Sequence, residues 1–235
     1  MSALAVRRVT VRYGGVTALE DVDVDVAPGS VVGLIGPNGA GKTTLLNAMT
    51  GVARTSSGTI ALGSTRLDGR AAHSIARAGV ARTYQNVRLF TNLDVAENVR
   101  AGAYRLPHAL GDLAVIALLE RTGVTERDLR RRAGALSYGE QRRLEMARAL
   151  ASQPAILLLD EPAAGMNPLE THSLGETIAS VARAGVGILL IEHDMSLVAA
   201  VCDTVVVLNF GRVIARGTPR EIAHDPAVIE AYLGS

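Results

Sequence analysis

The residues with the clearest chemistry form a short glycine-rich run near the start of the chain. Residues Gly36–Thr43 match the pattern G-x-x-x-x-G-K-[ST], follow the apolar run Val31–Ile35 and precede a helix-like segment. Glycines let successive N–H groups converge on phosphate oxygens, and the helix start adds the positive end of its dipole. That context favours a phosphate site over a chance turn. The expected phosphate-binding residues are Gly36, Pro37, Asn38, Gly39, Ala40, Gly41, Lys42 and Thr43.

Two residues at the end of this run have their own roles. The Lys42 ammonium can reach the β- and γ-phosphates of a nucleotide, and the Thr43 hydroxyl can be a ligand of Mg²⁺. A glycine-rich loop of this kind alone would serve a kinase, a GTPase or a transporter. Further residues are needed to choose among these classes.

A pair of acids follows the apolar run Ala155–Leu159. Ligands bind at the carboxyl ends of strands in α/β sheets, so Asp160 and Glu161 are expected beside the phosphate loop. We expect Asp160 to organise Mg²⁺, commonly through water, and Glu161 to polarise the attacking water as general base. Solvated acids at a strand end are the alternative, which the phosphate loop elsewhere in the chain disfavours.

Two more polar residues fit phosphoryl transfer, which needs positioning and charge stabilisation more than covalent chemistry. His193 follows the apolar run GILLIE, and Gln85 stands where strand-like sequence gives way to helix-like sequence. A histidine is by default a surface or satisfied core residue. We keep that interpretation for the other histidines, which are His73, His108, His172 and His224.

The composition excludes several function classes. The chain has 235 residues, enough for one sizeable domain or two small ones, and 48% of them are apolar. Its 24 basic and 23 acidic residues give a net charge of +1, and it contains no Trp, so no nucleic-acid partner is expected. Cys202 is the only cysteine, which excludes an internal disulfide and fits a reducing compartment.

The sequence contains no pattern typical of a secretion signal or a membrane span. Its first residues include basic side chains but no apolar stretch followed by a cleavage site. A spanning helix needs ~20 apolar residues, and the apolar runs here are only strand-sized. We therefore expect a cytoplasmic chain that could work at a membrane only by docking on another protein.

Apolar periodicity predicts a single α/β domain over residues 1–235. Val22, Val24 and Val26 alternate with aspartates, as in a half-exposed antiparallel strand. Later apolar runs alternate with helix-like segments, which indicates a mostly parallel sheet covered on both faces. The expected organisation is an α/β core, residues 1–86 and 153–235, with an N-terminal antiparallel β subdomain and an inserted helical subdomain, residues 87–152.

One further segment resembles a known family. Leu136–Arg143, LSYGEQRR, is similar to the signature sequence of ABC ATPases. With the phosphate loop, Gln85, Asp160-Glu161 and His193 in their order along the chain, the resemblance covers essentially the whole sequence. It implies a P-loop NTPase fold with a RecA-like core, ATP as substrate, Mg²⁺ as cofactor and ATP hydrolysis.

The resemblance also implies roles for single residues. Tyr13 corresponds to the aromatic residue that stacks on adenine, although it could equally be a strand residue without a ligand. In the family, signature residues bind the γ-phosphate held by the opposite subunit, so two ATP molecules would lie between two subunits. The implied nucleotide-binding set adds Thr44, Ser137, Gly139 and Glu140. The metal set is Thr43, Gln85 and Asp160, and the catalytic set is Lys42, Gln85, Glu161 and His193.

Departures from the commonest pattern narrow the resemblance. Tyr138 and Glu140 replace the Gly and Gln of LSGGQ, and Asn167 stands where an Asp is usual. Together with stretches such as GVARTYQNVRLF and DPAVIEAYLG, they are similar to the LivG-type ATP-binding subunits of branched-chain amino-acid importers. That implies membrane permease subunits, a second ATP-binding subunit (another copy or a sister ATPase) and, indirectly, a solute-binding protein. Importers of other amino acids, amides or urea stay open.

Three other interpretations compete with an importer. A soluble ABC ATPase acting on ribosomes or DNA usually looks like tandem cassettes or one cassette split by a coiled coil, and neither is present in this sequence. A P-loop phosphotransferase would leave Ser137–Gln141 and His193 without a role. An exporter is a third alternative, although many exporters carry fused membrane spans.

Overall fold

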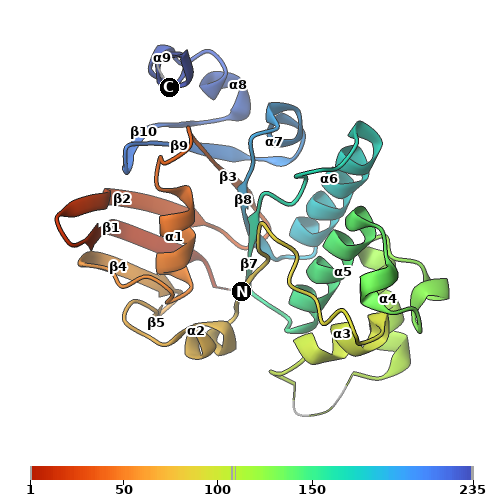
Figure 1. Ribbon diagram of the computed structural model, residues 1–235. Helices are drawn as coiled ribbons and strands as arrows, with labels where there is room; N and C mark the ends of the chain where they lie inside the picture. Colours follow the sequence, from red (N-terminus) through yellow and green to blue (C-terminus); the bar gives the residue numbers. More distant parts are fainter. Residues whose placement is uncertain (1, 107, 109, 234–235) are drawn as a thin grey trace.

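The computed structural model describes residues 2–106, 108 and 110–233, which fold around two β-sheets (Figure 1). The smaller sheet is antiparallel, with strand order β2-β1-β4-β5. Its strands are β1 (Leu4–Tyr13), β2 (Val16–Val26), β4 (Ser57–Leu62) and β5 (Thr65–Arg66). The predicted alternation is confirmed, because Val22, Val24 and Val26 are all fully buried.

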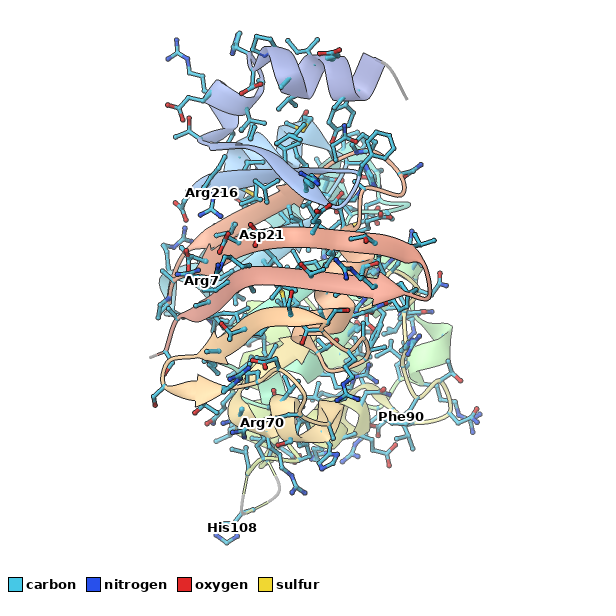
Figure 2. All side chains as sticks on the ribbon, turned by 90° about the vertical axis from the view of Figure 1, so that its left-hand side faces the viewer. Arg7, Asp21, Arg70, Phe90, His108 and Arg216 are labelled. Carbon is cyan, nitrogen blue, oxygen red and sulfur yellow. The ribbon has the colours of Figure 1, made fainter. Side chains whose placement is uncertain are left out.

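The outer face of this sheet carries charged side chains, and Figure 2 looks onto it with Arg7 and Asp21 labelled, together with Arg216 of the larger sheet. Arg7 forms an ion pair of 2.6 Å with Asp25 on the neighbouring strand. Arg216 donates a hydrogen bond of 2.6 Å to the carbonyl of Asp23. Half-exposed pairs of this kind contribute little stability, so burial of the valines on the other face holds the sheet in place.

The larger sheet has the strand order β10-β9-β3-β8-β7-β6 and is parallel from β9 to β6. Its strands are β3 (Val31–Ile35), β6 (Val80–Arg82), β7 (Ile156–Asp160), β8 (Gly187–Ile191), β9 (Thr204–Asn209) and the antiparallel edge strand β10 (Arg212–Gly217). Every residue of β3, β7 and β8 is buried, as expected for strands covered on both faces. The carboxyl ends of these strands meet along one edge, where ligands bind in such sheets.

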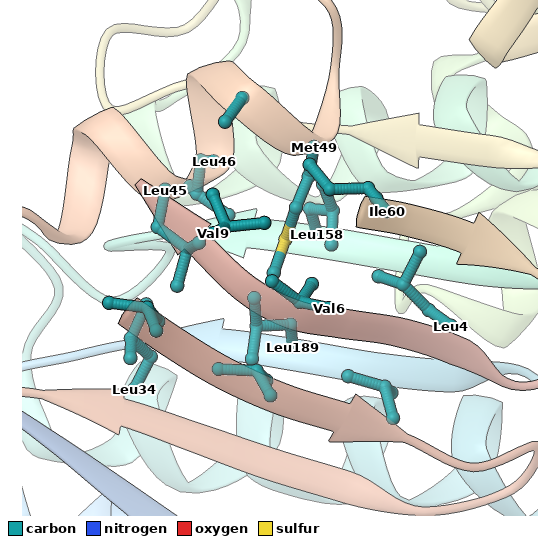
Figure 3. Packing of buried hydrophobic residues seen from close by; sticks show 14 of the residues in the cluster. Leu4, Val6, Val9, Leu34, Leu45, Leu46, Met49, Ile60, Leu158 and Leu189 are labelled. Atoms are coloured by element: carbon teal, nitrogen blue, oxygen red, sulfur yellow. The ribbon is translucent and has the colours of Figure 1, made fainter. Parts of the chain in front are cut away.

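Helix α1 (Lys42–Met49) lies between the two sheets and joins them into one core. Figure 3 shows Leu45, Leu46 and Met49 of this helix packed beside Val6 and Val9 of β1. The other face of the parallel sheet carries a second apolar cluster. The remaining helices of the α/β part are α2 (Ala72–Ala78), α6 (Pro168–Arg183), α7 (Met195–Val201), α8 (Pro219–Ile222) and α9 (Pro226–Leu233).

A third apolar cluster lies in the helical region drawn in yellow to green in Figure 1. It is formed mainly by α3 (Val95–Gly102), α4 (Asp112–Arg121) and α5 (Tyr138–Ala151), with short 3₁₀ turns at Glu126–Asp128 and Ala133–Ala135. Helix α3 begins only at Val95, because Asp94 caps it in a reciprocal pair with Glu97. The two sheets and these helices confirm the predicted α/β P-loop fold. Within the described part of the chain, no helix is long and apolar enough to cross a membrane.

Candidate nucleotide site

The glycine-rich loop connects β3 to α1 in a conformation that requires glycine. Gly36 has a φ of +148°, and a Cβ there would lie 2.0 Å from the carbonyl oxygen of Leu208. Gly41, the N-cap of α1, is left-handed with a φ of 106°. No described side chain caps α1, and its first turn contains no acidic residue. The first N–H groups of α1 therefore remain available to an anion.

Lys42 is buried at the start of α1 and points back over the loop. Its Nζ donates hydrogen bonds to the carbonyl oxygens of Gly36 at 2.6 Å and Pro37 at 3.0 Å. Burial lowers the pKa of Lys42, and the nearby charges of Glu161 and Asp160 oppose that shift. The ammonium is therefore held in the loop by weak neutral acceptors, which a phosphate oxygen can replace with a stronger charged one.

A cavity of about 540 Å³ opens over the loop. It brings together Gln85 and Glu161, two residues that the sequence predicts for catalysis. Tyr13 lies outside its lining, at the end of β1, where it pairs with Val16 and is 52% exposed. The lining residues are Val16, Thr17, Ala18, Asn38, Gly39, Ala40, Gly41, Lys42, Thr43, Thr44, Gln85, Glu161, Phe210 and Gly211.

The Glu161 carboxylate is held from two sides. Gln85 Nε2 donates a hydrogen bond of 2.8 Å to its Oε2, and His193 Nε2 lies 3.0 Å from its Oε1. The backbone of Glu161 has a φ of +48°, which is strained for a residue with a side chain. Three residues predicted from separate parts of the sequence thus meet at the carboxyl ends of the parallel strands. Such strain is common where a side chain must be aimed at a ligand.

Asp160 takes part in a buried ion pair that the sequence analysis did not find. Arg82 Nη2 lies 2.8 Å from Asp160 Oδ2, and the two side chains are only 6% and 7% exposed. Arg82 Nη1 also donates to Asn47 Oδ1 of α1 at 2.7 Å. Asp160 is therefore fixed behind the cavity rather than lining it. The partners are 78 residues apart in sequence, so local pattern carries no signal for the pair.

Glu192 and Arg142 also support the site and were missed. The buried Glu192 accepts hydrogen bonds from the backbone amides of Ala163 at 2.8 Å and His193 at 3.1 Å, and burial raises its pKa. Arg142 of α5 donates to the carbonyl oxygen of Tyr84 at 2.6 Å and to that of Gln85. Glu192 thus holds the backbone beside His193, and Arg142 holds the backbone beside Gln85.

The signature segment lies at the start of α5, apart from the cavity. Ser137 Oγ accepts from the Glu140 amide at 3.3 Å, and Glu140 Oε2 accepts from the Ser137 amide at 2.7 Å. None of the described residues that line the cavity comes from this segment. A Cβ added to Gly165 would lie 3.3 Å from the Tyr138 ring, so the side chain that departs from LSGGQ lies close to the backbone of Gly165. The two segments predicted to bind phosphate therefore lie apart from each other in the structure.

Asn167, the other departure, also has a structural role. Its side-chain oxygen accepts hydrogen bonds of 3.0 Å from the amides of Leu169 and Glu170, and Glu170 accepts from the Asn167 amide at 2.9 Å. Asn167 is thus the N-cap of α6. An Asn caps a helix about as well as an Asp does, so the replacement is compatible with the turn.

A glycine-rich loop, an open helix N-terminus and a carboxylate held over them define the class of P-loop nucleotide hydrolases. Comparison with known families then gives the particular group. A family model described as "ABC transporter" matches residues 19–164, and one described as "Branched-chain amino acid ATP-binding cassette transporter" matches residues 212–235. The chain belongs to the ABC transporter family, as an ATP-binding cassette protein.

Individual relatives agree with this assignment. The chain is 44% identical to the high-affinity branched-chain amino acid transport ATP-binding protein LivG of Salmonella typhimurium, over 98% of this chain and 97% of LivG. It is also 44% identical to BraF of Pseudomonas aeruginosa, a protein of the same description, with the same coverage. Among solved structures it resembles the ADP conformation of MJ1267, an ATP-binding cassette of an ABC transporter, with a TM-score of 0.89, 27% identity and 100% coverage of both chains.

Proposed function

We propose that this chain is the ATP-hydrolysing subunit of an importer for branched-chain amino acids. The observation that carries the proposal is the Glu161 carboxylate, held by Gln85 and His193 above an open phosphate loop. The cargo rests on a separate support, the names of LivG and BraF, each 44% identical over nearly the full length. Importers of other amino acids, amides or urea are the alternative for the cargo.

The loop residues bind and orient the nucleotide in this proposal. The uncapped N–H groups at the start of α1 and the Lys42 ammonium hold the phosphate chain against this helix. Glu161 accepts the proton of the attacking water, and its bonds to Gln85 and His193 fix the carboxylate in the required orientation. His193 lies within reach of the same carboxylate and would donate to the γ-phosphate as the water attacks.

The residues proposed for Mg²⁺ fit that ion by the chemistry of their donors. Thr43 and Gln85 line the cavity and offer hydroxyl and amide oxygens, and Asp160 lies behind them with a carboxylate. Hard oxygen ligands of this type are those that Mg²⁺ prefers. When bound, Mg²⁺ neutralises charge that develops on the phosphate oxygens. The ion pair with Arg82 holds the Asp160 carboxylate in one orientation in its buried position.

A second subunit would complete the site. Ser137 and Gly139 stand at the start of α5, outside the cavity over the loop. A helix start with a serine hydroxyl binds anions, so each subunit would offer this end to the γ-phosphate held by the other. ATP would then favour a closed pair, and hydrolysis would let it open. The second subunit is either another copy of this chain or a sister ATPase.

A surface cavity of about 410 Å³ fits the proposed contact with membrane permease subunits. It is lined by Phe90 and Tyr104, which are half-exposed, and by Tyr84 and Arg82, which lead to Gln85 and Asp160; Figure 2 labels Phe90. A permease segment seated there would contact the residues next to the catalytic glutamine. The chain would then sit peripherally on the inner face of the membrane, and a solute-binding protein would act only through the permease.

The proposed ATP hydrolysis is tested by measuring phosphate release from ATP when no acceptor is present. Glu161→Gln should keep ATP binding, lower turnover about 100- to 10,000-fold, as for loss of a general base, and favour an ATP-bound dimer. Glu176→Gln, at an exposed acid of α6, is the matched control and should leave turnover unchanged. Turnover at the wild-type rate in Glu161→Gln would show that Glu161 is not the general base. A requirement for an acceptor would favour a phosphotransferase instead.

Reconstitution with the permease and binding protein tests the cargo. Leucine, isoleucine or valine should stimulate ATP hydrolysis in vesicles that contain all components. Stimulation by another amino acid, an amide or urea, but not by these three, would keep the importer and replace its substrate.

A further inference from the structure

The turn between β9 and β10 contains a residue that the hairpin itself does not explain. Asn209 and Arg212 are paired, so Phe210 and Gly211 form a two-residue turn. Both have positive φ, +44° and +76°, as a type I′ turn requires. Asn, Asp or Gly normally takes the first position because side chains with larger Cβ substituents are strained there. Phe210 is strained in this way and is also 86% exposed.

The turn is fixed directly against the phosphate loop. The Gly211 amide donates a hydrogen bond of 2.9 Å to the carbonyl oxygen of Ala40, and the Gly211 carbonyl accepts one of 2.8 Å from the Glu20 amide. A Cβ on Gly211 would lie 2.6 Å from the Ala18 carbonyl oxygen, so only glycine permits this approach. Phe210 therefore has a defined position relative to the loop that holds phosphate.

Phe210 lines the same cavity as Lys42 and Glu161. In the strand order β10-β9-β3-β8-β7-β6, the phosphate loop follows β3, Glu161 follows β7 on one side, and Phe210 follows β9 on the other. Neighbouring strands are about 4.8 Å apart, so a ligand lying along this edge passes from Glu161 over the loop toward Phe210. The reacting γ-phosphate belongs at Glu161. The ribose and base then extend toward Phe210.

An exposed valine adds to the apolar surface at that end. Val16 is 68% exposed and lines the same cavity as Phe210, from the hairpin of the other sheet. Exposed aromatic and aliphatic side chains at one end of a phosphate cavity match a nucleobase, which has an apolar face and is attached to a charged chain.

We propose that Phe210 is a nucleobase-binding residue, which adds to the affinity for nucleoside triphosphates through the base and not through the phosphates. The proposal rests on the proposed ATP-hydrolysing function and concerns the base end of the same site. It adds a contact from the β9–β10 turn to that expected from Tyr13, which projects from the β1–β2 hairpin. Stacking of a base on an aromatic ring is tolerant of base identity, so Phe210 should contribute similarly for ATP and GTP.

The proposal is tested by calorimetry on the full chain. The affinity for ATP is compared with that for inorganic tripolyphosphate, which has no base. Phe210→Asn removes the ring and places in the turn a residue that type I′ geometry prefers, so the fold is retained. We expect its Kd for ATP to rise about tenfold and that for tripolyphosphate to stay unchanged, in line with the loss of one base–aromatic stack. Phe210→Trp should restore ATP affinity. Leu113→Asn, at a residue 84% exposed on α4, is the control for removal of a surface hydrophobe.

Three results would overturn the proposal, each in a recognisable way. Equal losses for ATP and tripolyphosphate would mean that Phe210 acts on the phosphate loop. Unchanged affinity for both, with weaker subunit association or lower permease-stimulated turnover, would mean that the ring contacts a protein. If the wild-type chain bound neither ligand, the ATP-hydrolysing function itself would fail, and this proposal with it. Tyr13→Ala, measured in parallel, gives the contribution of the family-predicted aromatic.

Discussion

Helices α1 and α5 begin in loops that the sequence assigns to phosphate binding, yet their N-termini are built in opposite ways. Helix α1 follows the left-handed Gly41, and within residues 2–106 no side chain caps it. Helix α5 begins with a complete capping box, in which Ser137 accepts from the Glu140 amide and Glu140 accepts from the Ser137 amide. One terminus is open to an anion, and the other contains a carboxylate of its own.

The two helix N-termini that are predicted to bind phosphate therefore differ before any ligand is present. In the proposed function, the uncapped N–H groups of α1 would bind phosphate without displacing a side chain. At α5 the Glu140 carboxylate already satisfies the Ser137 amide at 2.7 Å. A phosphate brought by a second subunit would have to move that carboxylate. Nucleotide binding by one subunit and closure of two subunits would therefore be separate steps with separate residues.

The largest expected effect comes from a substitution at the N-terminus of α1. Lys42→Ala removes the buried ammonium over the loop, and we expect ATP affinity of the isolated chain to fall about 1,000-fold, which is about 4 kcal/mol. Ser137→Ala at the α5 end should leave that affinity unchanged while it lowers turnover. Titration of fluorescent ATP measures both. If the two variants lost equal affinity in the monomer, the sites would not be separate.

A second test concerns the charges beneath α1. Arg82→Met leaves Asp160 buried without its partner, and we expect the free energy of unfolding to fall by about 3 kcal/mol, because an uncompensated buried charge is costly. Arg7→Met removes an ion pair whose side chains are half-exposed, and it should cost less than about 1 kcal/mol. Urea unfolding at neutral pH compares them. Similar losses in the two variants would contradict the stabilising role of the buried pair.

The cap of α5 gives a smaller effect. Ser137→Ala should lower the free energy of unfolding by about 1 kcal/mol, the usual cost of losing an N-cap. Thr43→Ala lies in the first turn of α1, which has no side-chain cap, and it should cost less. Urea unfolding of the two variants checks the comparison. A greater loss at Thr43 would show that α1 is capped by a contact other than those described.

Sequence reasoning succeeded where the chemistry is local. Glycines 36, 39 and 41 and the following lysine form one short run, and their pattern predicts both the loop and the helix after it. The apolar runs likewise predict the strands of the parallel sheet. The family resemblance puts Gln85, Glu161 and His193 in one catalytic set, and in the structure the side chains of Gln85 and His193 both contact Glu161.

The contacts that were missed are long-range or depend on backbone shape. Arg82 and Asp160 are 78 residues apart, and Arg142 reaches a carbonyl 58 residues away, so neither pair has a spacing that could be recognised in one sequence. Phe210 reads as an ordinary strand-end hydrophobe until the pairing of Asn209 with Arg212 places it in a strained turn beside the loop. The role of Tyr13 stays a prediction.

The substitution with the smallest expected effect tests the charge of Glu140 apart from its role in the capping box. Glu140→Gln keeps a residue that can complete the capping box and removes a negative charge from the anion site. The unfolding free energy should fall by about 0.3 to 1 kcal/mol, because a carboxylate stabilises a helix N-terminus.

ATP-dependent dimer formation should at the same time become about two- to fivefold tighter, because the incoming phosphate no longer displaces a like charge, and the gain should shrink at high salt. Sedimentation in a Glu161→Gln background measures the dimer. Glu97→Gln is the matched control, because Glu97 completes a capping box of the same kind at the start of α3. This variant should lose stability without any change in dimer formation. A weaker dimer in Glu140→Gln would mean that the carboxylate helps to hold the second subunit. The Glu140 carboxylate would then be a contact to that subunit, and not a group that the incoming phosphate must displace.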